Sequence, residues 1–472
     1  MKRAILRTFC GVVILIPALH ASVGSGQTIS EKIDAILAAV PGNQWTALVE
    51  NESGSVVCYQ RDPTNGLAPA SNTKMFTTAA AFALLGTNHA FETRIYCDGP
   101  LTNGVLAGNL NLVCEHDPTW NTSVFPSVRE PLDHIAAQLK AHGLASVASN
   151  VQCYGACAFN LGSSDNLAAR PTETRNAEAA AAFVAALRAN GITVSGSAAG
   201  QTGFSAPGTL FYTHHSTDLA REGNPLRLDI ACIPLLKVSH NVMADLLCRH
   251  LGWKFGGSDS YSAGAAQILR WLNDAAGLST NGMVMNDGSG LSRGNRFSAR
   301  QCVALVRYLL AAYPTWETGL PIGCRDGTIR RRFCGTDGES QVHAKTGSLR
   351  ISIALSGYLI NAYDHQRYLF SFIANRPNID QAGTRQAIDH AVVLFGAPKL
   401  VRPEVSMTSN TVTFTWAASP GQKYRVQFKN SLSDAQWQTL GSDVTATNTR
   451  AITSDPSLGT AAQRFYRLLL VN

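Results

Sequence analysis

Residues 69–85 read PASNTKMFTTAAAFALL, and this stretch decides how the rest of the chain is interpreted. It predicts a helix that begins after Pro69 and ends at Gly86, where a left-handed cap fits glycine. The spacing of three places Ser71 and Lys74 on one helical face, about one turn apart. A serine hydroxyl is a weak nucleophile that needs a base, and a lysine of lowered pKa can be that base. Because most Ser-x-x-Lys pairs are only a helix start and a surface lysine, this pair needs support from other motifs.

The second motif is Lys345-Thr346-Gly347, which is followed by Ser348 and a strand. A lysine and a hydroxyl group that begin an edge strand can bind a substrate carboxylate. Gly347 would let the substrate backbone approach closely, because glycine has no side chain. An ordinary turn into a strand is the alternative interpretation of the same triplet.

A third element, Ser-x-Asn, occurs at 239–241, 164–166 and 279–281. The first leads into a helix, the second lies in a loop rich in glycine and serine, and the third is a turn between helices. A rigid helix start positions side chains better than a loop does. We therefore favour Ser239 and Asn241.

Together and in this order, the three motifs resemble those of the penicillin-recognising serine enzymes. Further stretches narrow the resemblance to class C low-molecular-mass penicillin-binding proteins, and it covers about residues 30–397. These stretches are residues 108–110 with 117–118, 286–293 and 326–333. Those proteins are D-alanyl-D-alanine carboxypeptidases and endopeptidases. The resemblance implies an α+β fold of the penicillin-binding-protein/β-lactamase type, in which an antiparallel sheet carries helices.

The resemblance also implies roles for the catalytic residues. Ser71 would attack the carbonyl between two D-alanines and form an acyl-enzyme, and Lys74 would take its proton. Ser239 would relay a proton to the leaving amine. No metal or other cofactor is implied, because Lys74 serves as the base.

The same resemblance assigns the substrate-binding residues. Asn241 and Lys345 would hold the substrate, and Thr346 and Ser348 would bind its terminal carboxylate, beside Gly347. Backbone N–H groups of the nucleophile and of Ser348 would form the oxyanion hole. The implied partners are peptidoglycan stem peptides, with β-lactam antibiotics as covalent inhibitors.

Two features depart from the family pattern. His240 stands at the middle of the second motif, where the family often has Asp or Asn. Ser71 and Ser239 lie 168 positions apart, whereas the family insertion at this place carries two extra domains and is longer. We therefore expect one of those domains to be shortened or lost.

Residues 1–26 predict a secretory signal, with basic residues before a short apolar run and small residues after it. No later segment is apolar and long enough for a transmembrane span. Ten cysteines remain besides Cys10, and exported proteins retain disulfides. Cys153 with Cys157, and Cys324 with Cys334, are close enough in sequence to pair. We expect an exported protein of the periplasm or cell envelope.

The strand and helix patterns divide the rest of the chain into units. Residues 27–399 predict a peptidase domain with an inserted β-rich subdomain at about 90–208, and residues 400–472 predict a C-terminal all-β sandwich. Within the peptidase domain, strands are expected at 45–50 and 56–60 near one end and at 351–361 and 367–375 near the other. One sheet should therefore combine both ends of the domain.

Composition excludes some other functions. The net charge is +7, and three of the basic residues lie in the expected signal. The sequence has no stripe of basic residues interleaved with aromatic residues. Nucleic acid is therefore not expected as a partner. His214-His215 is a possible metal-ligand pair, but without a carboxylate at the usual ligand spacing it does not predict a metal site. A β-lactamase or esterase using the same serine, and a wall-binding protein without activity, are the alternative functions. Sequence alone leaves open the choice between carboxypeptidase and endopeptidase, and the oligomeric state.

Overall fold

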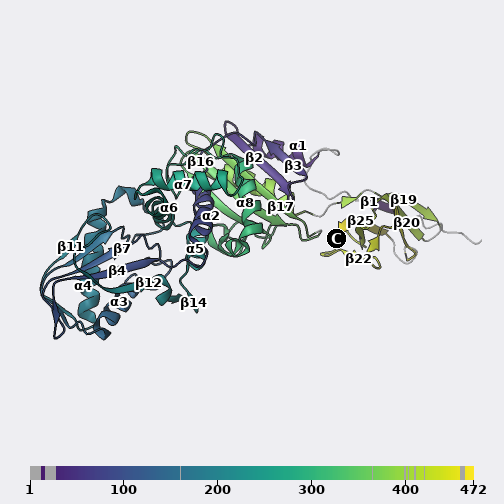
Figure 1. The fold of residues 1–472 in the computed structure, drawn as a ribbon. Helices are drawn as coiled ribbons and strands as arrows, with labels where there is room; N and C mark the ends of the chain where they lie inside the picture. Colours follow the sequence, from purple (N-terminus) through teal and green to yellow (C-terminus); the bar gives the residue numbers. More distant parts are fainter. Residues whose placement is uncertain are drawn as a thin grey trace, which may run out of the picture.

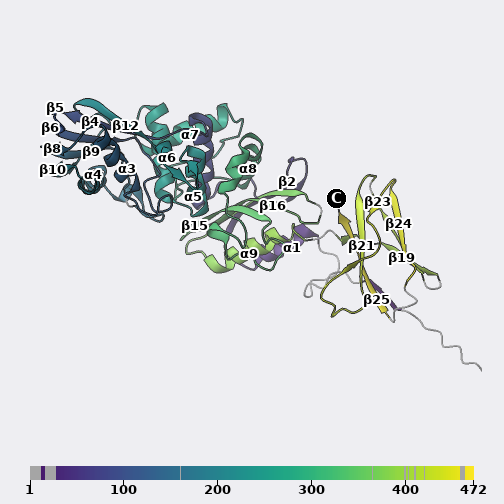
Figure 2. The same cartoon turned by 90° about the horizontal axis from the view of Figure 1, so that it is seen from below.

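The structure is a computed structural model, and the residues that it describes are 12–15, 28–159, 161–363, 365–397, 400–401, 403–408, 411–418, 420–457 and 463–471. Figures 1 and 2 show three units that follow one another along the molecule. A mixed α/β insert lies at one end, the sheet and helices that carry the motifs lie in the middle, and a small β unit lies at the other end.

A five-stranded antiparallel sheet forms the middle unit, in the order β15-β16-β17-β2-β3. Its strands are β2 (Gln44–Asn51), β3 (Val57–Arg61), β15 (Val342–Leu349), β16 (Ser352–Ile360) and β17 (Arg367–Asn375). β17 pairs with β2 along its whole length, so that Phe370 lies opposite Val49. The predicted sheet built from both ends of the domain is confirmed.

Helices cover both faces of this sheet. Alternate residues of a strand point to opposite faces; accordingly Val49 packs with α1 and α9, whereas Leu48 packs in the core formed by α2, α5, α6, α7 and α8. These helices are α1 (Ile29–Ala38), α2 (Thr73–Leu85), α5 (Leu228–Lys237), α6 (Asn241–Gly256), α7 (Tyr261–Asp274), α8 (Ala299–Ala312) and α9 (Gln381–Val393). Short 3-10 turns lie at η1 (Ala70–Asn72), η4 (Pro314–Gly319) and η5 (Gly327–Ile329).

The insert between α2 and α5 is an α/β unit. Its main sheet has the order β11-β9-β7-β4-β12, with parallel pairing between β11, β9 and β7, and a short sheet β10-β8-β6-β5 lies beside it. Its elements are β4 (Glu92–Asp98), β5 (Leu101–Thr102), β6 (Val105–Leu106), β7 (Asn109–Cys114), α3 (Glu130–Ala141), β8 (Ser146–Val147), β9 (Val151–Gly155), η2 (Leu167–Ala169), α4 (Thr172–Ala189), β10 (Thr193–Val194), β11 (Ala198–Gly200), β12 (Thr209–His215), η3 (Ser216–Asp218), β13 (Ala220–Arg221) and β14 (Asn224–Pro225).

The insert is rich in strands, as the sequence predicts, and it contains helices α3 and α4, which pack on its sheets in one hydrophobic core. Its sheet also extends past residue 208, because β12 pairs with β4 as far as His215. The sequence pattern missed α3 and the parallel strands, since short buried strands and helices carry similar apolar runs.

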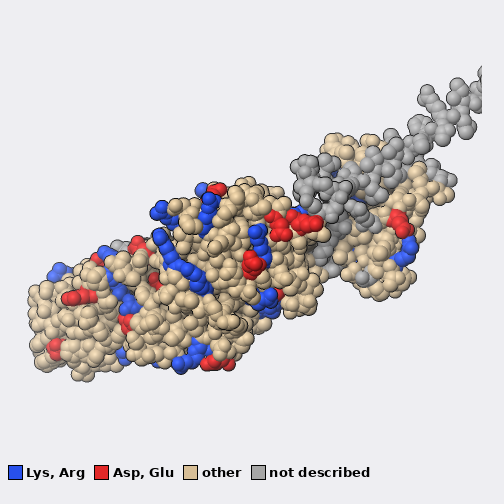
Figure 3. Space-filling model, turned by 90° about the horizontal axis from the view of Figure 1, so that it is seen from above, with Lys and Arg blue, Asp and Glu red and all other residues tan. Residues whose placement is uncertain are grey.

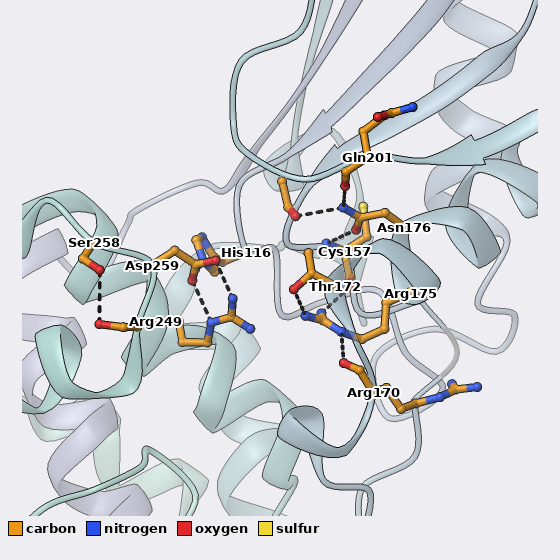
Figure 4. A network of polar contacts seen from close by, with 12 residues as sticks. His116, Cys157, Arg170, Thr172, Arg175, Asn176, Gln201, Arg249, Ser258 and Asp259 are labelled. Atoms are coloured by element: carbon orange, nitrogen blue, oxygen red, sulfur yellow. Dashed lines mark hydrogen bonds and ion pairs between the residues drawn. The ribbon is translucent and has the colours of Figure 1, made fainter.

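A polar network joins the insert to the catalytic unit (Figure 4). Nε2 of His116, which follows β7, lies 2.7 Å from Oδ1 of Asp259, and Arg249 of α6 donates to the same carboxylate. On the insert side, Asn176 donates from Nδ2 to the carbonyl oxygens of Gly155 and Gln201. The insert is therefore fixed to α6 and to the segment before α7 by buried polar contacts.

The unit after residue 400 consists of two sheets, as the sequence predicts. One has the order β1-β25-β21-β22, with β18 beside β25 and β23 beside β21, and the other has the order β19-β20-β24. Their inner faces form a separate core that includes Trp416, Tyr424 and Tyr466. The strands are β18 (Leu400–Val401), β19 (Glu404–Thr408), β20 (Thr411–Ala417), β21 (Lys423–Lys429), β22 (Gln438–Thr439), β23 (Val444–Thr445), β24 (Arg450–Asp455) and β25 (Gln463–Val471).

The expected signal segment contributes one strand to this unit. β1 (Val12–Leu15) runs parallel to β25. The other residues of 1–26 lie outside the described residues, and the signal peptide stays a prediction. Among the described helices, none combines the length and apolar character needed to cross a membrane.

The described cysteines form two disulfides, Cys114–Cys157 and Cys324–Cys334. The second is the pair expected from sequence, but pairing of Cys153 with Cys157 is wrong. Cys114 and Cys153 lie on the neighbouring strands β7 and β9, so both approach Cys157, and Cys153 stays a thiol with its Sγ 2.9 Å from that of Cys157.

The even number of cysteines in an expected exported protein predicts that most of them are oxidised, and this prediction is wrong. Six described cysteines are free, and five of them are buried. Buried thiols pack as small apolar groups, so an even number of cysteines does not require pairing.

Candidate active site

Ser71 and Lys74 lie together where a 3-10 turn passes into α2. Ser71 belongs to η1, and Lys74 stands one turn later, in the first turn of α2. Nζ of Lys74 lies 2.9 Å from Oγ of Ser71. Lys74 is fully buried, whereas Ser71 is partly exposed, so the serine is accessible from outside while the amine is not.

Two further oxygen atoms surround the Lys74 amine. Oδ1 of Asn241 lies 2.8 Å from Nζ, and the carbonyl oxygen of Ser289 lies 2.6 Å from it. Burial lowers the pKa of Lys74 to about 7, against the opposing effect of the carboxylates of Asp245 and Asp287. Close to neutral pH, a large fraction of this lysine is therefore an uncharged amine with a lone pair.

The loop before α8 supplies the Ser289 carbonyl and is held in place by Asp287. The carboxylate of Asp287 accepts hydrogen bonds from the backbone N–H groups of Gly290 and Ser292. Gly290 has φ +88°, and a Cβ there would lie 1.9 Å from the carbonyl oxygen of Ala70. Only glycine fits where this loop touches the turn that carries the serine.

Ser239 and Lys345 form the opposite side of the site. Nζ of Lys345 donates to Oγ of Ser239 over 2.8 Å and to the carbonyl oxygen of Thr346 over 2.9 Å. Lys345 is fully buried, and burial together with the nearby Lys74 holds its pKa well below the usual value. The site thus contains two buried amines, each hydrogen-bonded to one serine hydroxyl.

Residues 345–348 lie on β15, the edge strand of the sheet, beside the turn of Ser71. A Cβ at Gly347 would lie 2.5 Å from the carbonyl oxygen of Pro69, so glycine is needed for this strand to pack against the turn. The hydroxyl of Thr346 donates to Thr328 over 2.8 Å, and Ser348 is exposed. The first residues of β15 pair with residues 321–323, and from Lys345 onward its edge presents hydroxyl and backbone groups next to Ser71.

Of the three Ser-x-Asn stretches in the described part of the chain, 239–241 is the one whose side chains hydrogen-bond to Lys74 and Lys345. Asn166 instead caps the short turn η2, and the 279–281 turn is held by Gln301. Ser239 has φ +60° and lies in the turn that separates α5 from α6. Asn241 is the first residue of α6, and the start of this helix fixes its position.

His240, the departure from the family pattern, is buried and caps α6. Its Nδ1 accepts a hydrogen bond from the backbone N–H of Met243 over 3.4 Å, and burial lowers its pKa to about 4. A neutral imidazole can accept this hydrogen bond as Asp or Asn would.

Sequence reasoning placed the serine and lysine residues but missed part of their surroundings. The Ser289 carbonyl and the carboxylates of Asp245 and Asp287 were not assigned to the site. The stretch 286–293 was recognised as a family motif, and its polar and glycine-rich composition was the available signal. A backbone carbonyl has no side-chain signature, so only the fold identifies it.

Comparison with known proteins agrees with this geometry. The sequence profile of the D-Ala-D-Ala carboxypeptidase 3 (S13) family matches residues 29–159 and 162–396. The chain belongs to this family. Its activity is that of a serine-type D-Ala-D-Ala carboxypeptidase, and the family resemblance inferred from the motifs is confirmed.

Individual proteins also resemble the chain over most of its length. The D-alanyl-D-alanine carboxypeptidase of Actinomadura sp. (strain R39) is 27% identical over 448 residues, which cover 73% of this chain and 80% of that protein. A carboxypeptidase of Mycobacterium tuberculosis is 27% identical over 358 residues, covering 67% of this chain and 73% of the relative.

Solved structures with the same fold include penicillin binding protein 4 of Haemophilus influenzae, in complex with a β-lactam. It has a TM-score of 0.63 and 20% identity, and the match covers 76% of this chain and 99% of that one. A predatory endopeptidase of Bdellovibrio bacteriovorus has a TM-score of 0.52 and 14% identity, covering 77% and 95% of the two chains. These likenesses confirm the predicted fold of the peptidase unit.

Proposed function

We propose that this carboxypeptidase uses Ser71 as nucleophile and Lys74 as general base to cleave the D-Ala-D-Ala bond of peptidoglycan stem peptides in the cell envelope. The arrangement around Nζ of Lys74 supports these roles. An uncharged amine has two hydrogens and one lone pair. The two hydrogens can be donated to the oxygens of Asn241 and Ser289, which lie 2.8 and 2.6 Å away. The lone pair is then left for the hydroxyl proton of Ser71, 2.9 Å away.

In acylation, Oγ of Ser71 attacks the carbonyl carbon of the penultimate D-alanine while its proton passes to Lys74. The C–N bond then breaks, and the proton that Lys74 took from Ser71 passes to the leaving amine through Ser239, whose hydroxyl is positioned by Lys345. The backbone N–H groups of Ser71 and Ser348 stabilise the oxyanion that forms in between. Water then attacks the acyl-enzyme and releases the shortened peptide.

Recognition of the terminal carboxylate is assigned to β15. Lys345 supplies an amine whose protonated form the substrate carboxylate would stabilise, Thr346 and Ser348 supply hydroxyl donors, and Gly347 keeps the strand close to Ser71. A β-lactam presents a carboxylate beside a strained amide, so the same groups would bind it and leave a stable acyl-enzyme. Export through the segment 1–26 would bring the enzyme to its substrate.

Release of D-alanine from a pentapeptide ending in D-Ala-D-Ala tests this function. The wild type should release one D-alanine per peptide and should form a penicillin adduct on Ser71. Ser71→Ala should lose both activities, whereas Ser164→Ala, in the unused Ser-x-Asn stretch, should keep them. Adduct formation by Ser71→Ala at the wild-type rate would disprove the assignment.

The same experiment separates the alternative functions. A β-lactamase would hydrolyse penicillin rapidly without releasing D-alanine, and a wall-binding protein would do neither. A cross-linked dimeric muropeptide, offered in parallel, distinguishes endopeptidase from carboxypeptidase activity.

A further inference from the structure

Three potential metal ligands meet in the insert, away from the site described above. They are His134 of α3, His214 at the end of β12, and Asp218 of η3, and each offers one ligand atom within 4.8 Å of the other two. The sequence singled out His214-His215 as a ligand pair without a carboxylate. The fold supplies that carboxylate from Asp218, four residues after His214, and a second imidazole from His134 of helix α3.

The distances suit a small ion with tetrahedral geometry. Nδ1 of His214 lies 3.2 Å from Oδ2 of Asp218. Ligand bonds of about 2.0–2.1 Å to zinc place neighbouring tetrahedral ligands about 3.3 Å apart. The rings of His134 and His214 have centroids 5.4 Å apart and are tilted by 52°, so they are not stacked face to face. Both nitrogen-bearing edges can therefore approach one ion.

His214 is also a buried imidazole whose polar partners are incomplete. The residue is 1% exposed; its Nδ1 faces Asp218, and within the described residues its Nε2 has no hydrogen bond. Buried polar atoms are almost always paired, and an exception requires a physical explanation such as a missing ion. A metal ion would satisfy this ring and would separate it from the carboxylate that faces it.

A backbone hydrogen bond already orients the carboxylate of Asp218. Oδ2 of Asp218 accepts a hydrogen bond from the backbone N–H of His215 over 2.9 Å. Groups of this kind fix the direction of a first ligand and contribute to metal affinity. The side chain of His215 itself lies on the other side of the strand and is 43% exposed near Glu92.

We propose that His134, His214 and Asp218 bind one Zn²⁺ ion, with water at the fourth position. Two imidazoles and one carboxylate favour zinc and neighbouring transition metals over Mg²⁺, which prefers oxygen ligands alone. This differs from the expectation from sequence that the chain holds no metal.

The ion would hold the chain where it returns from the insert to the catalytic unit. η3 follows β12 directly, and Ser216 exchanges hydrogen bonds with the backbone of Phe91 at the start of β4. Metal binding would link α3 to this connection between the insert and the catalytic unit. The proposed role is therefore structural, and the chemistry at Ser71 does not depend on it.

Titration of metal-free full-length protein with Zn²⁺, in competition with a chromophoric chelator, tests the site. The wild type should bind one ion per chain, and zinc should raise its melting temperature, whereas Mg²⁺ should not. Asp218→Asn keeps the hydrogen bond from His215 but loses the charged ligand, and should weaken zinc binding by at least ~10-fold. His214→Ala should do the same.

His215→Ala is the matched control and should bind zinc as the wild type does. Asp218 is exposed, so Asp218→Asn should fold even if the buried His214 variant does not, and circular dichroism would establish this. The proposal is overturned if the wild type binds no stoichiometric zinc. It is also overturned if folded Asp218→Asn binds zinc with unchanged affinity.

Discussion

Nζ of Lys345 lies 2.8 Å from Oγ of Ser239, although 106 positions of sequence separate the two residues. The hydrogen bond joins the edge strand β15 to the turn between α5 and α6. One lysine can therefore position the proposed proton relay and also attract the substrate carboxylate. Because of this double role, substitution of Lys345 tests the site more sharply than substitution of Ser71 or Ser239 alone.

Lys345→Ala should lower kcat/KM for a D-Ala-D-Ala peptide by ~100-fold or more, because a charge that pairs with the substrate is lost. The loss should be smaller for the same peptide with an amidated C-terminus, which has no carboxylate. Lys237→Ala removes a lysine that pairs with Asp326 and should serve as the control. Equal losses for both peptides would show that Lys345 does not recognise the carboxylate.

The rate of acylation by penicillin should rise with pH and reach a plateau above about 7. The pKa of Lys74 is lowered to about 7, so below that pH the protonated amine cannot accept the proton of Ser71. Each pH unit below the midpoint should cost about tenfold in rate. Stopped-flow measurement of adduct formation between pH 5 and 9 gives the midpoint.

Asp245→Asn should move that midpoint to lower pH, because the carboxylate of Asp245 raises the pKa of Lys74. The amide oxygen can still accept the hydrogen bond that the backbone N–H of Gly288 donates to this residue, so the loop should stay in place. An unchanged midpoint in this variant would show that Lys74 is not the titrating base.

Acid should destabilise the junction between insert and catalytic unit. Burial holds the pKa of His250 well below 6.5 and lowers that of His89 to about 4, and the neighbouring Lys254 acts in the same direction on both. The unfolded state then binds more protons, so stability is unaffected above pH 6.5 and falls below it. For the buried His250 the loss is up to about 1.4 kcal/mol per pH unit.

Thermal unfolding at pH 7.5 and 5.0 measures this effect. His250→Phe keeps a ring beside Phe91 and Trp253 but cannot be protonated, and should lose less stability between the two pH values than the wild type. His390→Phe, on an exposed part of α9, should lose as much as the wild type. If His250→Phe behaves like this control, the buried ring does not set the acid sensitivity.

Peptide mapping without reduction should recover the bonds Cys114–Cys157 and Cys324–Cys334. Cys153 should be alkylated only after unfolding, because it is fully buried and burial raises the pKa of its thiol. Cys153→Ser should leave both bonds intact. Recovery of a Cys153–Cys157 bond would contradict the pairing.

The C-terminal sandwich should be dispensable for acylation. Its core contains no residue of the catalytic unit, and the proposed catalytic residues all precede it. A chain ending at Lys399 should fold and should react with penicillin within a few-fold of the full-length rate. A truncated protein that is folded by circular dichroism yet unreactive would show that the sandwich helps to form the site.

Charges of both signs are mixed on one face of the molecule. On the face shown in Figure 3, lysine and arginine side chains are interspersed with aspartate and glutamate, without a continuous basic band.

The sequence by itself determined the central sheet, the helix α2 and the pair Ser71–Lys74. These features depend on local patterns: short, mostly apolar runs in β2 and β17, helical spacing in α2, and the three-residue separation of a serine and a lysine on one turn. A separation of three or four residues fixes which side chains of a helix are neighbours, whatever the rest of the fold does.

Only the tertiary structure decided which groups surround Ser71 and Lys74. The carbonyl of Ser289 reaches Lys74 across 215 positions, and its acceptor role depends on backbone geometry rather than on a side chain. Cys157 pairs with Cys114 rather than with the nearer Cys153 because strand pairing, not sequence distance, sets which sulfurs meet. His134 comes to His214 in the same way, by the packing of α3 near the end of β12. Contacts between segments that are distant in sequence depend on how helices and strands pack into a core, and no local sequence pattern specifies this packing.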